Sequence, residues 1–184
     1  MADFAEAGLP TVRAEAWKYT NLNALRPLLL RGDVAAPAVS VDRVNGLLPA
    51  GEAWRAVFVD GAFRAELSDL AGLPAGLAVR GLAEALAEDG DALEPLLAGP
   101  DGAIGLPLVQ LNTAFMAGGC VIDLADGAVI ERPLELVFAS TGVGATHAVR
   151  TIVRAGANSR LDLVESYVGL ADGGDVTSSV TQVH

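Results

Sequence analysis

The chain has 184 residues, of which 52% are hydrophobic, so the composition excludes disorder of the whole chain. Twelve Lys+Arg stand against 23 Asp+Glu, which gives a formal net charge of −11. A field of that sign repels nucleic acid and anionic membranes, so we expect neither as a partner. No apolar run approaches the roughly 18 residues of a spanning helix. The acidic N-terminus and the single cysteine, Cys120, favour a cytoplasmic protein without an intrachain disulfide.

Residues 1–50 have a helical and irregular pattern. Thr11 is a candidate N-cap for a short helix that includes residues 14–17. Four leucines then recur at helical spacing, although Pro27 limits the length of a helix there: Leu22, Leu25, Leu28 and Leu29.

The next part of the chain, to about residue 117, combines strand and helix signals. Residues 56–64 predict a β-hairpin, because Asp60-Gly61 supplies the two positive-φ positions of a type I′ turn. Apolar spacing predicts three short helices. They cover residues 81–88, which Asp89-Gly90 ends, residues 91–98, and residues 106–117, which Gly118-Gly119 ends.

After Cys120 the pattern changes to short strands separated by turn residues. Candidate strands cover residues 121–124, 129–130, 134–138, 148–153, 161–165 and 176–183. Such spacing is typical of a sandwich, a barrel or a β-solenoid. The composition is rich in Ala, Val and Gly and only 5% aromatic, which slightly favours the solenoid, whose coils stack on small residues.

Five segments, taken together and in this order, resemble conserved segments of SufD proteins of the SufB/SufD family. The first is Leu9–Thr20, which contains Pro-Thr-x-Arg-x-Glu-x-Trp-Lys-Tyr-Thr. The others are Phe58–Phe63 with Leu67–Leu70, Leu111–Phe115 (Leu-Asn-Thr-Ala-Phe), Gly127–Leu134, and Arg150–Val153 with Asn158-Ser159 and Val164–Tyr167. The matches cover most of the chain.

The resemblance implies a fold that is mainly β with an N-terminal α/β region. Residues 1–117 would form a helical and mixed region with the hairpin near 56–64. Residues 118–184 would form the first coils of a right-handed parallel β-helix, a single-stranded β-solenoid. The family also has a C-terminal helical domain, and we expect it to lie beyond His184.

The resemblance further implies a non-catalytic scaffold subunit for iron–sulfur cluster assembly. Members of the family pair with SufB and recruit the ATPase SufC, so the complex handles a transient cluster and SufC binds the ATP. No cofactor is expected in this chain. The chain is not expected to bind SufC by itself, because the docking segment lies in the C-terminal domain. We expect it either to form a homodimer through residues after about Leu161 or to leave its last residues poorly ordered. The alternative is a β-solenoid enzyme acting on carbohydrate or acyl groups.

The residues themselves predict no catalytic, cofactor-binding or metal-ligating position. One thiol cannot hold a cluster that needs about four ligands, so Cys120 is interpreted as a small buried hydrophobe. His147 and His184 lack a second ligand at metal-binding spacing and are interpreted as structural or exposed. Asp172 and Asp175 flank two glycines but lack the twelve-residue calcium pattern, which favours a solvated turn.

Three other features are weighed against a structural interpretation. Trp17-Lys18-Tyr19 could dock a partner, but packing of the two aromatic side chains against the body is favoured. Glu165 and Tyr167 point to one face of a strand as a simple pair, without a catalytic role. Gly118-Gly119 follows a helix instead of opening one, so it is no phosphate loop.

Overall fold

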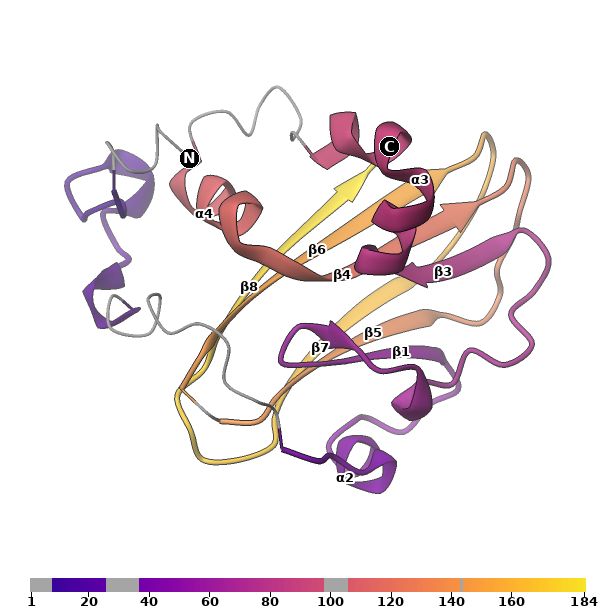
Figure 1. Cartoon of the computed structure of the whole chain (residues 1–184), viewed down its shortest axis with the longest axis horizontal. Helices are drawn as coiled ribbons and strands as arrows, with labels where there is room; N and C mark the ends of the chain where they lie inside the picture. Colours follow the sequence, from indigo (N-terminus) through magenta and orange to yellow (C-terminus); the bar gives the residue numbers. More distant parts are fainter. Residues whose placement is uncertain (1–7, 26–36, 98–105, 143) are drawn as a thin grey trace.

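The computed structural model describes residues 8–25, 37–97, 106–142 and 144–184 (Figure 1). The helical elements are η1 Glu15–Trp17, η2 Leu22–Leu25, α2 Val41–Asn45, η3 Ala65–Leu67, α3 Leu82–Leu97 and α4 Pro107–Phe115. The strands are β1 Trp54–Val59, β2 Ala62–Phe63, β3 Leu77–Gly81, β4 Met116–Leu124, β5 Leu134–Ser140, β6 Thr146–Ala155, β7 Leu163–Gly169 and β8 Val176–Val183. Leu28 and Leu29, predicted to continue the first helix, lie outside the described residues.

The eight strands form two four-stranded sheets. One sheet has the order β2-β1-β5-β7 and the other the order β3-β4-β6-β8. Strands β1, β5 and β7 pair in parallel, as do β4, β6 and β8, whereas β2 and β3 add antiparallel edges. From β4 onward the chain alternates between the sheets, so the β5–β6 and β7–β8 connections reach the same end of the molecule (Figure 1).

The predicted fold class, a parallel β-helix or solenoid, is wrong. The described residues form a mixed α/β fold whose two sheets are each mixed, and the first two thirds of the chain supply strands to both. Short strands at even intervals show where strands occur, but they do not show which sheet each strand joins or that helices cover the sheets. The solenoid on which the alternative of a β-solenoid enzyme depended is therefore absent from the described residues.

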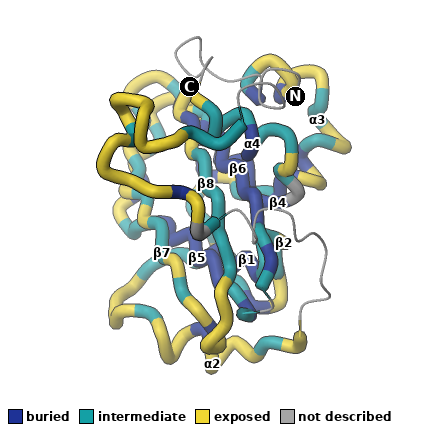
Figure 2. The backbone as a smooth tube through the Cα atoms, turned by 90° about the vertical axis from the view of Figure 1, so that its left-hand side faces the viewer, coloured by how far each residue is buried: buried dark blue, intermediate teal, exposed yellow. Residues whose placement is uncertain are grey.

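Alternation along the strands builds three apolar layers. Phe58 and its in-facing neighbours meet the other sheet in a core that includes Cys120 and Ile122. Out-facing residues of β1 and β5 pack under Val44 of α2, and out-facing residues of β4 and β6 pack under Leu93 of α3. Figure 2 shows the buried strands between exposed loops. Both outer faces are thus covered, which agrees with the near-continuous burial of β5 and β6.

Local turn and helix signals hold in part. Asp60 and Gly61 have φ of 49° and 85° and join β1 to β2, as the Asp-Gly pair predicts. The predicted helix break is also confirmed, since Asp89 (φ −139°, ψ 30°) is non-helical inside α3. In contrast, α4 ends at Phe115, and Gly118-Gly119 belongs to β4 instead of ending a helix. No helix in the described part of the chain has the length and apolar character needed to cross a membrane.

Candidate functional site

Three ionisable side chains meet where the connections between the sheets converge. Asp60 follows the last residue of β1, His147 is the second residue of β6, and Asp175 directly precedes β8. The parallel register of β6 and β8 pairs Thr146 with Val176, so His147 and Asp175 lie at neighbouring strand starts. A backbone hydrogen bond from Asp60 N–H to Ala139 O holds the first aspartate beside the end of β5.

The Asp60–His147–Asp175 cluster is compact and shielded from solvent. His147 Nε2 lies 3.3 Å from Asp60 Oδ1 and 4.0 Å from Asp175 Oδ2, and one possible ligand atom from each residue lies within 4.8 Å of the others. The side chains are 7%, 8% and 3% exposed for Asp60, His147 and Asp175. Despite the short distances, Nε2 of His147 is buried without a hydrogen-bond partner among the residues that the structure describes.

Neighbouring donors fix both carboxylates. Thr141 donates its N–H to Asp60 Oδ1 at 2.9 Å and its hydroxyl to Oδ2 at 2.6 Å. Asp175 accepts the backbone N–H groups of Gly142 at 2.6 Å, Gly144 at 2.7 Å and Ala145 at 3.0 Å. Burial opposes ionisation of Asp175 most strongly, but these N–H groups and His147 together outweigh it and hold its pKa below the ordinary value.

A second polar cluster lies around the middle of β6, and its central residues Arg150 and Asn112 are completely buried. Arg150 donates through Nε to Asn112 Oδ1 at 3.1 Å, through Nη1 to Gln182 Oε1 at 2.6 Å and through Nη2 to Thr113 Oγ1 at 2.7 Å. Burial lowers the pKa of Arg150 from its usual value. All its acceptors are neutral, and they come from α4 and β8, so the guanidinium fastens a helix to the sheet.

Asn112 extends that cluster to the backbone. Its Nδ2 donates to Val149 O at 3.1 Å and to Ser178 O at 2.7 Å. The Leu-Asn-Thr-Ala-Phe segment that carries the family resemblance is therefore a packing motif, in which Asn112 and Thr113 dock α4 onto β6 and β8. Gln182 continues the network by donating to Leu96 O of α3 at 2.9 Å.

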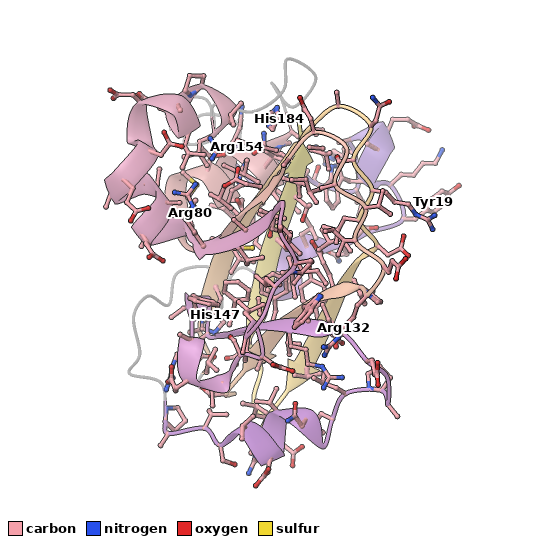
Figure 3. The ribbon with its side chains drawn as sticks, turned by 90° about the vertical axis from the view of Figure 1, so that its right-hand side faces the viewer. Tyr19, Arg80, Arg132, His147, Arg154 and His184 are labelled. Carbon is pink, nitrogen blue, oxygen red and sulfur yellow. The ribbon has the colours of Figure 1, made fainter. Side chains whose placement is uncertain are left out.

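A third cluster joins charged side chains at the opposite end of β6. Asp123 accepts from Arg154 Nε and from Arg80 Nη2, the latter at 3.0 Å. The same arginines pair with Asp89 at 3.0 Å and Glu88 at 3.1 Å, so α3 is tied to β3, β4 and β6. Figure 3 shows Arg80 and Arg154 toward one end of the molecule and His147 toward the other.

Two interpretations from the sequence can now be compared with the structure. Cys120 is fully buried, as predicted, and burial raises the pKa of its thiol to about 12, which makes it inert. The prediction of a solvated turn is wrong for Asp175, whose carboxylate is buried under backbone N–H groups. Asp172 and His184 are exposed. Local spacing could not reveal the Asp60–His147–Asp175 cluster. Asp175 meets His147 only through the pairing of β6 with β8, and Asp60 comes from a distant turn.

The remaining candidates are the aromatic residues. Tyr19 is 92% exposed, so the prediction that it packs against the body is wrong, whereas Trp17 is half-buried. Lys18 lies over the Tyr19 ring at 5.2 Å and pairs with Glu15. The simple pair predicted on β7 is confirmed, since Tyr167 Oη donates to Glu165 Oε2 at 2.7 Å. Burial is the main cause that raises the pKa of Tyr167 to about 12.

Comparisons with known proteins place the chain in a family. A family model described as the SufBD protein N-terminal region matches residues 1–136. An iron–sulfur cluster assembly SufBD family protein of Synechocystis is 30% identical over 165 residues, which are 86% of this chain and 35% of the relative. The chain thus spans about a third of the length of that relative. It belongs to the SufBD family, in the N-terminal region of that family.

Proposed function

We propose that this chain is the N-terminal part of a SufD-type scaffold subunit that supports iron–sulfur cluster assembly together with SufB and the ATPase SufC. The match of residues 1–136 to the SufBD N-terminal region carries the proposal, and the name of the Synechocystis relative supplies the process. The proposed role is non-catalytic, and the proposed location is the cytoplasm. The proposed scaffold role does not itself assign a cofactor to residues 1–184.

The positions of the family segments support a scaffold. Asn112 and Thr113 of the Leu-Asn-Thr-Ala-Phe segment hold α4 on the sheet through Arg150, which is itself in a matching segment. Phe58 of the hairpin segment stacks on Phe138 with ring centroids 5.1 Å apart, and Phe138 stacks on Tyr167 at the same distance. Side chains from these segments thus hold the helix and the two sheets together, as a subunit that positions other proteins requires.

Depletion of the protein in its own cells tests the process. The activity of a hydratase that depends on a [4Fe–4S] cluster, such as aconitase, should fall, while a dehydrogenase without a cluster should keep its activity. Re-expression of the protein should restore the first activity. If both enzymes are unaffected by depletion, the assembly role is wrong.

Affinity purification from the same cells tests the partners. SufB and SufC, identified by mass spectrometry, should copurify with the tagged natural protein. In contrast, the 184-residue chain alone should not retain purified SufC. Failure of SufB and SufC to copurify with the natural protein would contradict the proposed complex, and saturable binding of SufC by the 184-residue chain would show that the SufC surface lies in this region.

A homodimer of the 184-residue chain is a further part of the proposal. In the described sheets β7 and β8 are edge strands, and such edges recruit other strands. Val164 and Tyr167 on β7 and Val183 on β8 are exposed apolar residues beside these edges. Light scattering should give a dimer mass, and Val164→Lys should shift the population toward monomer. A wild-type monomer at all concentrations would contradict it.

A further inference from the structure

The Asp60–His147–Asp175 cluster differs in one respect from an ordinary ion pair. At 3.3 Å, His147 Nε2 and Asp60 Oδ1 are close enough to interact, yet Nε2 makes no hydrogen bond within the described part of the chain. Burying a ring nitrogen without a partner costs free energy, because the nitrogen loses its contact with water. The imidazole is 8% exposed, so bulk solvent does not satisfy it.

Charge balance makes the same point. Two carboxylates lie within 4.8 Å of each other across the imidazole, and their side chains are almost fully buried. Among the described residues, neither carboxylate forms an ion pair with a lysine or arginine. A protonated imidazole would neutralise only one of the two negative charges. A divalent cation would neutralise both.

The carboxylates are oriented as ligands usually are. Each one accepts two or three hydrogen bonds that fix its plane, and a carboxylate has about four acceptor positions in all. Asp60 Oδ1 and Asp175 Oδ2 therefore keep unused lone pairs, and these are the oxygens nearest to His147 Nε2. Such supporting hydrogen bonds orient the ligands of metal sites in proteins.

We infer that Asp60, His147 and Asp175 form a binding site for a first-row divalent transition metal, with one imidazole nitrogen and two carboxylate oxygens as ligands. Zinc binds nitrogen and oxygen at about 2.0–2.2 Å, so two ligands at the tetrahedral angle lie about 3.4 Å apart. The nitrogen and the Asp60 oxygen, 3.3 Å apart, already have about this separation, and Asp175 Oδ2, 4.0 Å from the nitrogen, must approach by about 0.6 Å. An oxygen ligand also lies off the axis of the imidazole lone pair, which explains a short distance without a hydrogen bond.

The ligand set selects the kind of metal. Imidazole nitrogen suits Zn²⁺, Fe²⁺ and Co²⁺, and carboxylate oxygens extend the range to Mn²⁺, whereas Ca²⁺ prefers six to eight oxygen ligands. Three protein ligands leave one or more positions for water or another molecule. The inference does not depend on the proposed assembly function, because it rests on the geometry of the three side chains.

Isothermal titration of the chelator-treated 184-residue chain with Zn²⁺ tests the site. We expect saturable binding at a ratio of roughly one ion per chain, and a rise of the Tm with Zn²⁺ because only the folded state assembles the ligands. Co²⁺ in the same site should give visible absorption bands from tetrahedral or five-fold coordination. If the folded chain binds no Zn²⁺ saturably, the inference is wrong and the cluster is an internal ion pair.

Asp60→Asn is the most informative variant. Asparagine tolerates the positive φ of 49° at this position, its Oδ1 can still accept Thr141 N–H, and its amide can donate to Thr141 Oγ1. The turn should therefore survive with an unchanged Tm in the absence of metal. Loss of the charge should weaken Zn²⁺ binding by about tenfold or more. Equal affinity of Asp60→Asn and wild type would overturn the site.

Two histidine variants complete the test. His147→Gln should abolish saturable binding, and the Co²⁺ bands should disappear. His184→Gln removes the one other histidine in the sequence, which is exposed, and should leave binding unchanged. Binding that survives in His147→Gln, or that is lost in His184→Gln, would contradict the inference. If His147→Gln does not fold, the result for Asp60→Asn still decides.

Discussion

Strand β6 carries two buried bases only three residues apart, His147 and Arg150, and their surroundings differ. Each nitrogen of the Arg150 guanidinium donates to a neutral oxygen, whereas Nε2 of His147 has no hydrogen-bond partner in the described residues although two carboxylates are nearby. The comparison separates two uses of a buried polar group. A group in which every nitrogen has a partner fastens elements together, and a group with an unpartnered nitrogen next to oriented acceptors is prepared for a ligand.

The largest expected effect comes from the Arg150 cluster, in which Asn112, Thr113 and Gln182 accept from the guanidinium. Arg150→Met keeps the side-chain bulk but leaves the oxygens of Asn112, Gln182 and Thr113 buried without their donor. The free energy of unfolding should fall by about 3 kcal/mol, which urea denaturation can measure. Zn²⁺ binding at 25 °C by the remaining folded chain should be retained.

Arg160→Met is the matched control, since Arg160 is an exposed arginine. It should change the free energy of unfolding by no more than about 0.5 kcal/mol. If Arg150→Met is as stable as this control, Arg150 does not fasten α4 to the sheet and its contrast with His147 disappears.

The next largest effect on stability comes from the close contact between the backbone of β4 and the Asp60-Gly61 turn. A Cβ on Gly118 would lie 1.6 Å from Gly61 O, so Gly118→Ala must push the Asp60-Gly61 turn away from β4. We expect a loss of about 2 kcal/mol in the free energy of unfolding. Because that turn carries Asp60, Zn²⁺ affinity should fall as well, unlike in Arg150→Met.

Gly90→Ala is the control for adding a methyl group. Nothing lies within 4 Å of a Cβ there, and Gly90 is helical, so alanine should stabilise by about 0.5–1 kcal/mol. A Gly118→Ala chain that keeps both wild-type stability and Zn²⁺ affinity would show that β4 does not position the site.

The difference between β4 and the hairpin also shows what the sequence could predict. Asp60-Gly61 and the Asp89 break depend on conformations of a few adjacent residues, and both were predictable from local signals. Gly118-Gly119 has the same local signature as a helix end, but glycine is needed there because distant carbonyls approach closely, that of Gly61 at Gly118 and that of Arg150 at Gly119. No local pattern contains those contacts.

The sequence predicted neither the fold class nor the Asp60–His147–Asp175 cluster, and the physical reason is the same for both. Strand spacing predicted many strands after Cys120, but sheet membership depends on pairings such as β1 with β5, between segments far apart in the chain. The cluster of Asp60, His147 and Asp175 depends on the same pairings. The spacing between His147 and any other ligand in the sequence therefore carries no signal of a site.

The smallest expected effect concerns Asp123 of β4, which pairs with Arg154 near the end of β6 opposite to His147. Burial opposes ionisation of Asp123 most strongly, but Arg154 and Arg80 outweigh it, so its pKa in the folded chain lies below the ordinary 3.8. The unfolded chain takes up this proton first as the pH falls. Asp123 therefore stabilises the fold at neutral pH and loses that contribution as the pH falls from the ordinary value through the folded one.

Asp123→Asn should reduce the free energy of unfolding at pH 7 by about 1 kcal/mol, because the carboxylate is partly exposed and its ion pairs are screened. At pH 3 the gap between variant and wild type should narrow. Urea denaturation at both pH values measures it, with and without added salt, which should also narrow the gap at pH 7. Zn²⁺ affinity should be unchanged, since Asp123 lies on β4 beside the other end of β6. A gap that widens in acid would mean that the fold disfavours the ionised carboxylate of Asp123. The charged cluster around Asp123 would then no longer contrast with the Asp60–His147–Asp175 cluster as one in which the charges stabilise each other.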